Sequence, residues 1–145
     1  MAIYGAGSKW NEDEMKETFF EQGRFILGWN DQNAKDLYEA ITTLKVGDII
    51  YLKSNAPGSR NVRVKGIGVV SKSFIQNITD GDYRNVALED WDSLFVTVNW
   101  IRREEFRIVI PEEEGKLTNI RAASFYEEFL PFVQTAILNA LFPDN

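Results

Sequence analysis

The sequence predicts an α+β fold, in which a small twisted β-barrel of five to six strands is flanked by helices and followed by an additional C-terminal helix. Stretches rich in β-branched and aromatic residues, typical of strands, occur at residues 49–53, 61–72, 94–102 and 104–110. Apolar residues recur at helical spacing in residues 33–44 and 122–141. Gly66 and Gly68 lie inside the second strand-like stretch, and such glycines are typical of the bends that close a small barrel.

The N-terminal third is predicted to alternate strand and helix. Residues 2–4 form a short strand, and Asn11 caps a first helix whose opening turn carries the acids Glu12, Asp13 and Glu14, which the helix dipole favours. Gly23 ends that helix. A strand at residues 24–29 leads into the second helix, which has one apolar stripe made of Leu37, Tyr38, Ile41 and Leu44.

The remaining elements follow from turn residues and alternation. A loop at residues 54–59 separates two strands, the second of which points Arg63 and Lys65 outward. Residues 73–92 are polar and are expected to form a loop, followed by two more strands up to Pro111. An acidic turn then leads to the late helix, which Pro131 is expected to kink or divide.

Composition indicates an ordinary globular protein. The chain has 145 residues, of which 44% are hydrophobic and 26% charged, and it contains no cysteine. No apolar run approaches the length of a membrane span and no export leader is apparent, so we expect a single domain over residues 1–145 that begins at Met1 and works in the cytoplasm. The absence of cysteine fits that compartment.

Catalysis is not expected. The chain has neither His nor Cys, so the usual zinc ligands, thiol nucleophiles and imidazole bases are missing. Asp48 and Lys53 come close to the spacing of a metal-dependent nuclease, but Tyr51 stands where a second acid would be needed. We therefore predict no enzyme activity.

The charges are unevenly distributed. The net charge of −6 argues against a broad nonspecific nucleic-acid binder, yet residues 49–79 contain no Asp or Glu. The cations of this segment are Lys53, Arg60, Arg63, Lys65 and Lys72. Such a segment favours a focused site for an anionic ligand, and chance clustering on solvated strand faces is the alternative.

Short motifs in a particular order resemble a known family. The stretches GRFILGW, VGDIIYLK, VKGIGVV and VNW follow one another as in the EVE-like domains of the PUA superfamily, over about residues 2–110. The resemblance is greatest to the specificity modules of prokaryotic modification-dependent restriction or defence systems, which are distant relatives of YTH readers. Residues 111–145, the acidic turn and the C-terminal helix, lie outside it.

The resemblance implies a reader of modified nucleic acid. Members of that family take one base of DNA or RNA into an aromatic pocket at the mouth of a PUA-like barrel, without a cofactor. They are commonly joined to a motor or nuclease, so an ATPase or nuclease effector protein is an expected partner. Which base is read, which modification it carries, and whether it belongs to DNA or RNA are left open.

The residues themselves also predict an aromatic pocket. Extruding a base costs a few kcal/mol, and stacking on aromatic rings recovers about 1–3 kcal/mol per base. Trp29 follows Gly28 where a strand ends, so the ring can form a stacking wall while the glycine leaves room for the ligand. Trp10 is placed similarly, after a glycine-bearing turn. Packing at the rim of the core is the alternative for both rings.

Two further rings are candidates for the ligand site. Trp100 shares the VNW motif, although its strand position favours core packing. Tyr51 points to the face of its strand opposite Ile50 and Leu52. The alternative to a ligand contact is a tyrosine packed inside the barrel.

Polar residues beside the expected mouth complete the prediction. Lys53, Ser54 and Asn55 lie where a strand opens into a loop, and they are expected to contact a phosphate or a base edge. The flanking phosphates are expected to contact Arg60, Arg63 and Lys65.

Two other functions are left open. The apolar face of the late helix is also typical of a helix that docks on a partner protein or forms a homodimer, whereas packing across its own barrel would leave a monomer. A sensor of small nucleotides, using the same basic mouth, is a third hypothesis.

Overall fold

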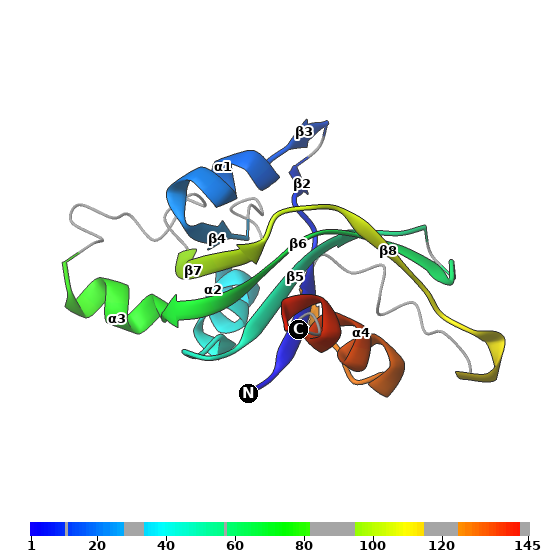
Figure 1. Cartoon of the computed structure of the whole chain (residues 1–145). Helices are drawn as coiled ribbons and strands as arrows, with labels where there is room; N and C mark the ends of the chain where they lie inside the picture. The colour runs from blue at the N-terminus through cyan, green and yellow to red at the C-terminus, as the bar shows by residue number, and fades with distance from the viewer. Residues whose placement is uncertain (11, 28–33, 57, 82–94, 115–124, 143–145) are drawn as a thin grey trace.

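The computed structural model describes residues 1–10, 12–27, 34–56, 58–81, 95–114 and 125–142, with the backbone alone for Trp10 and residues 34–38. Within these residues the chain forms one seven-stranded sheet, a separate two-stranded hairpin and helices (Figure 1). The strands of the large sheet are β1 (Ile3–Ala6), β4 (Arg24–Ile26), β5 (Ile49–Ser54), β6 (Asn61–Lys72), β7 (Phe95–Arg102), β8 (Phe106–Val109) and β9 (Phe125–Glu127).

The sheet is built around its longest strand, β6. Its hydrogen-bonded order is β4-β7-β6-β5-β1-β9, with β8 as an additional neighbour of β6. β7 pairs with residues 67–72 of β6 and β8 pairs with residues 61–64, so two successive strands share one edge of it. β1 and β5 are parallel, and the other pairs are antiparallel. The predicted α+β class, a small curled sheet flanked by helices, is confirmed.

Irregular pairing bends β6 near its two glycines. The register with β5 shifts between Leu52 and Lys53, opposite Gly66, and the register with β7 shifts between Ile67 and Gly68. A Cβ atom at position 66 would lie 2.6 Å from Cζ of Phe20, so glycine is needed there for the phenyl ring to lie on the strand. The predicted bend at Gly66 and Gly68 is therefore present, and it helps to curl the sheet.

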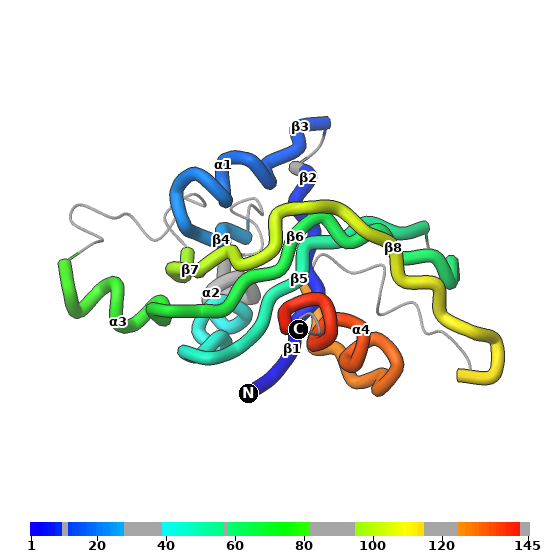
Figure 2. The backbone as a smooth tube through the Cα atoms, in the orientation of Figure 1, coloured from blue at the N-terminus to red at the C-terminus, as the bar shows by residue number. Residues whose placement is uncertain are grey.

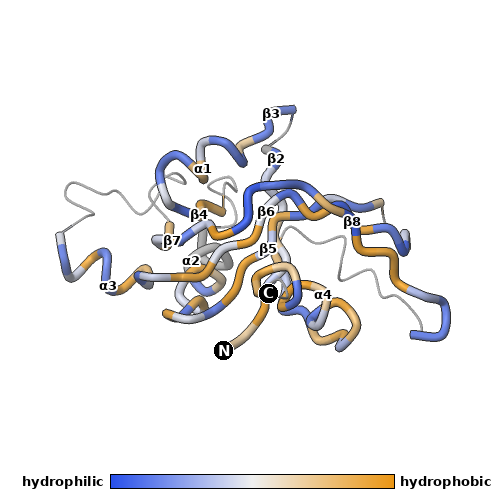
Figure 3. Tube along the Cα trace, in the orientation of Figure 1, coloured by the Kyte–Doolittle hydropathy of each residue, from blue (hydrophilic) through white to orange (hydrophobic). Residues whose placement is uncertain are grey.

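The helices cover both faces of the sheet (Figure 2). They are α1 (Lys16–Gln22), α2 (Ala34–Thr43), α3 (Phe74–Thr79) and α4 (Pro131–Leu141), with a 3₁₀ turn η3 (Glu112–Glu114). On β5, Ile50 and Leu52 belong to a cluster with α1, α2 and α3, whereas Ile49 and Tyr51 belong to a second cluster with α4. Successive strand residues point to opposite faces, so β5 is buried on both sides, and its apolar residues Ile49, Ile50 and Leu52 serve both clusters (Figure 3).

The first helix starts later than predicted. β2 (Lys9–Trp10) pairs with β3 (Asp13–Glu14) as a hairpin, and α1 begins only at Lys16. The prediction of Asn11 as its cap is therefore wrong, although residue 11 itself lies outside the described residues. The amide of Met15 donates to the carbonyl of Ser8, which closes the hairpin. Gly23 ends the helix as predicted, with a φ of 63°.

The segment predicted as a loop from residue 73 begins with a helix. Ser73 caps α3: its hydroxyl accepts from the amide of Gln76, and the Gln76 side chain accepts from the amide of Ser73. This is a capping box, which the order Ser73-x-x-Gln76 could have indicated. Residues 82–92 of the predicted loop lie outside the described residues.

The late helix is shorter than predicted. Residues 125–127 form β9, which pairs with β1, and α4 begins at Pro131. Proline neither kinks nor divides the helix, because at the first helical position its missing N–H costs no hydrogen bond. The apolar face of α4 packs on its own sheet through Val133, Ile137 and Leu141.

Candidate nucleic-acid interface

The two tryptophans on which the predicted pocket depends are only partly described. Trp29 and Gly28 lie outside the described residues. Trp10 ends β2 and is paired across the hairpin with Asp13, while its side chain is not described. Their role in stacking a base stays a prediction.

Trp100 is a core residue in this structure. Its side chain is 5% exposed and meets the ring of Phe20 edge-on, with centroids 5.3 Å apart. The indole N–H donates to the carbonyl of Arg24 over 3.2 Å, which satisfies its one polar atom. The assignment of Trp100 to a ligand site is corrected accordingly, because neither face of the indole is open to a base.

Tyr51 is also enclosed. It is fully buried, its hydroxyl donates to Oε1 of Glu128 over 2.7 Å, and the hydroxyl of Tyr126 lies 2.7 Å away. A phenol carries one proton, so Tyr126 is the donor to Tyr51. Burial, together with these neighbours, raises the pKa of Tyr51 above its ordinary range. The assignment to the ligand site is therefore corrected: Tyr51 holds β5, β9 and the start of α4 together.

The loop after β5 brings two of the three predicted polar residues together. Nζ of Lys53 donates to Oδ1 of Asn55 over 2.8 Å and lies 5.2 Å from the centre of the Tyr126 ring. Lys53 is buried, whereas Ser54 and Asn55 are half-buried. Ser54 and Asn55 remain accessible to a ligand, while the Lys53 ammonium would have to leave its present contacts.

The three predicted phosphate contacts have different environments. Arg60 donates to the carbonyl of Pro111 over 2.7 Å. Arg63 binds the carboxylate of Glu105 through two nitrogens, at 2.9 and 2.7 Å. Lys65 is 3% exposed and pairs with Glu14 at 2.7 Å, so the prediction that it points outward is wrong. Lys65 has no partner on β5, and it is buried because Ser8 and Glu14 at the hairpin cover its side of β6.

Lys65 belongs to a buried network that the sequence did not indicate. Nζ of Lys65 lies 3.3 Å from Oγ of Ser8, and that hydroxyl donates to the second oxygen of Glu14 over 2.7 Å. Burial raises the pKa of Glu14, but the hydrogen bonds from Lys65 and Ser8 outweigh it and leave this pKa below the ordinary value. The network ties β3 to β6 and thereby positions the hairpin that carries Trp10.

A second ionic group lies where β7 passes into β8. The carboxylate of Glu105 is 2.5 Å from Nζ of Lys16 and 2.7 Å from Arg63. The hydrogen bonds from Arg63 and then Lys16 lower the pKa of Glu105 to about 2. The stretch Arg102–Arg107, which contains three arginines, was not singled out from the sequence, although RREEFR is a visible basic cluster.

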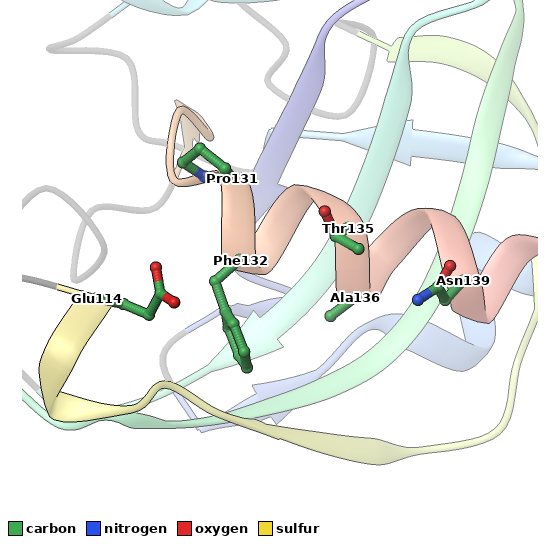
Figure 4. Close-up of a pocket in the computed structure, with 6 residues that line it drawn as sticks. All are labelled: Glu114, Pro131, Phe132, Thr135, Ala136 and Asn139. Carbon is green, nitrogen blue, oxygen red and sulfur yellow. The ribbon is translucent and has the colours of Figure 1, made fainter.

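A cavity of about 390 Å³ opens between η3 and α4 (Figure 4). Its lining residues are Glu114, Pro131, Phe132, Thr135, Ala136 and Asn139. With one aromatic ring, one carboxylate and no cation in the lining, it lacks the paired stacking surfaces and phosphate contacts of a base-binding site.

The described residues contain no group of three or more acidic side chains that could hold a metal ion. No helix among them is long and apolar enough to cross a membrane.

Comparison with solved structures identifies the fold. The chain superposes on the YTH domain of the Zygosaccharomyces rouxii MRB1 protein, solved in complex with N6-methyladenosine RNA, with a TM-score of 0.52 and 18% identity over 99% of this chain and 89% of that one. A hypothetical protein from Leishmania major is similar over 98% and 95% of the two chains, with a TM-score of 0.51 and 13% identity. The chain has a YTH-like fold.

Sequence comparison adds no family. No protein-family model matches the chain, and no curated protein does. The resemblance to EVE-like domains therefore stays a prediction.

Three elements of this fold lie together: the hairpin of β2 and β3, the start of α1, and the bend between β7 and β8 (Figure 1). The Lys16–Glu105 ion pair joins the start of α1 to that bend.

Proposed function

We propose that this chain is a nucleic-acid reader module that takes one modified base into an aromatic pocket, without catalysis. The observation that carries the proposal is the likeness to a YTH domain over nearly the whole chain, together with the N6-methyladenosine RNA bound by that relative. Trp10 and Trp29 are the proposed stacking rings. A DNA or RNA strand with a modified base is the proposed partner, and an ATPase or nuclease of a prokaryotic defence system is the proposed effector.

The energetics favour two rings over one. Extruding a base from its stack costs a few kcal/mol, and each aromatic contact returns about 1–3 kcal/mol, so two rings offset the extrusion. A rigid support reduces the entropy lost on binding. The Ser8–Glu14–Lys65 network supplies that support for the hairpin of Trp10, because it anchors β3 through a buried cation.

Binding of modified oligonucleotides tests the proposal. We expect single-stranded RNA with one N6-methyladenosine, or DNA with N6-methyladenine, to quench tryptophan fluorescence and to bind more tightly than the unmodified strand. Trp29→Ala and Trp10→Ala should each weaken binding by roughly 5- to 150-fold, the equivalent of one stacked ring. Phe142→Ala, which removes a 69% exposed ring from the end of α4, is the matched control and should bind normally.

Equal affinity for modified and unmodified strands in both nucleic acids would contradict a reader of this modification. Retained preference in both tryptophan variants, with folding verified by circular dichroism, would contradict the pocket.

A protein-interaction module is the second candidate, favoured by the cavity beside α4. Its volume lies within the range of ligand sites, and the rings of Phe129 and Phe142 on either end of α4 are 72% and 69% exposed. Because Val133 and Ile137 already pack on the sheet, a partner would bind the outer side of the helix.

A further inference from the structure

Two arginines face each other across β6 and β8. Arg63 and Arg107 are directly opposite in the antiparallel register, where side chains of like charge repel. Arg63 is compensated by Glu105, whereas among the described residues Arg107 forms no ion pair and donates to the neutral Oδ1 of Asn61, at 3.1 Å. An uncompensated guanidinium beside a second one is an arrangement that a bound anion would stabilise.

Two more guanidinium groups lie at the same bend. The guanidinium carbon of Arg102 lies 4.5 Å from the centre of the Phe106 ring, and that of Arg103 lies 5.7 Å from the centre of the Phe20 ring. Neither has an ion pair in the part of the chain that the structure describes. Stacking on a ring restrains an arginine without consuming its N–H donors. Nε of Arg102 donates to the carbonyl of Glu104 over 3.4 Å, which leaves its terminal nitrogens for other contacts.

Among the described residues, cations outnumber carboxylates in this region. We call residues 102–107, together with Lys16 and Arg63, the β7–β8 corner. Its acids are Glu104 and Glu105, and Glu105 is already shared by Lys16 and Arg63. Arg103 and Arg107 are both exposed and form no ion pair with a described residue, so the corner presents cationic donors on a chain whose net charge is −6.

The corner lies next to the hairpin that carries Trp10. Lys16, which pairs with Glu105, is the first residue of α1, and α1 follows β3 after one residue. The tube view shows β3 and α1 above the bend between β7 and β8 (Figure 2). A strand whose base enters a pocket beside Trp10 would therefore pass within reach of the corner.

We propose that the β7–β8 corner binds the sugar-phosphate backbone that flanks the bound base, with Arg103 and Arg107 as its phosphate contacts. This inference rests on the proposed reader function and adds to it the surface along which the flanking nucleic acid runs. Arg102 and Arg63 lie beside these two proposed phosphate contacts. Guanidinium groups suit it because their fork of donors matches two phosphate oxygens.

Salt dependence of binding tests the proposal. The variants are R103Q/R107Q, the charge-conserving R103K/R107K, and K45Q, which removes an exposed cation from the turn before β5, near the C-terminal end of β6, whereas the corner pairs with the middle of that strand. The probe is single-stranded RNA or DNA with one N6-methylated adenine, titrated between about 50 and 200 mM salt. We expect R103Q/R107Q to bind several-fold more weakly and to lose about 0.7 from the slope of log affinity against log salt for each lost contact.

The ratio of affinities for modified and unmodified strands should not change in R103Q/R107Q, since phosphates carry no base information. R103K/R107K should keep most of the slope, and K45Q should behave as wild type. A wild-type slope and affinity in R103Q/R107Q, while the wild type still prefers the modified strand, would overturn this inference alone. A reduced slope in a protein that has no such preference would support the corner and overturn the reader.

Discussion

Glu105 shows how one carboxylate can hold two cations at the surface. It accepts from Arg63 through two nitrogens and from Lys16 at the start of α1. These bonds favour its charged form, so its pKa falls below the ordinary value of 4.5 to about 2. A carboxyl with a depressed pKa contributes stability that is fully present above its unfolded pKa and is lost as the pH falls through the folded one.

We therefore expect Glu105 to titrate with a midpoint near 2, and its contribution to stability to disappear between about pH 4.5 and pH 2. Carbon-detected NMR of the side-chain carboxyl measures this midpoint. In Arg63→Gln the midpoint should rise toward 4.5, because the largest cause of the shift is removed. An unchanged midpoint in that variant would show that the bidentate contact does not persist in solution.

At the scale of the element, local sequence signals and tertiary pairing compete. The acids Glu12, Asp13 and Glu14 suit the first turn of a helix, yet Glu14 lies in a strand because Ser8 and Lys65 bind its carboxylate. By contrast, the capping box of α3 is a local signal that the fold keeps.

Ser73→Ala should destabilise the protein by about 0.5–2 kcal/mol, because the amide of Gln76 loses its acceptor. Urea unfolding measures the change. Ser71→Ala, which removes an exposed hydroxyl with only a 3.4 Å contact to Thr97, is the matched control and should stay within about 0.5 kcal/mol of wild type. Equal effects of the two variants would exclude a stabilising cap.

At the scale of the whole molecule, the sheet separates two cores. One includes the side chains of α1, β4 and α3, and the other lies between the sheet and α4. Ile137, which is fully buried, belongs to the second core, whereas Phe142 at the end of α4 is largely exposed. The inner side of α4 is thus part of the core, and only its outer side is open to a partner.

Ile137→Ala should cost about 2–5 kcal/mol of unfolding free energy, because it leaves a cavity between α4 and the sheet. Phe142→Ala should change stability by no more than about 0.5 kcal/mol. Thermal and urea unfolding, at two protein concentrations, measure both. A midpoint that depends on concentration and falls only in Phe142→Ala would instead indicate that α4 is the seam of a dimer.

Sequence patterns alone were enough to predict strands β1 and β4 to β8, the bend at Gly66 and Gly68, the end of α1 at Gly23 and the α+β class, because periodicity, turn residues and backbone freedom are local properties. The strands β2, β3 and β9, and the enclosure of particular side chains, depend on tertiary contacts. Alternation predicted Lys65 outside, but Ser8 and Glu14 at the hairpin cover that side of β6 and bury it. Burial depends on which strands and helices meet, and that pairing brings together residues far apart in the chain, such as Tyr51 with Glu128 and Lys16 with Glu105.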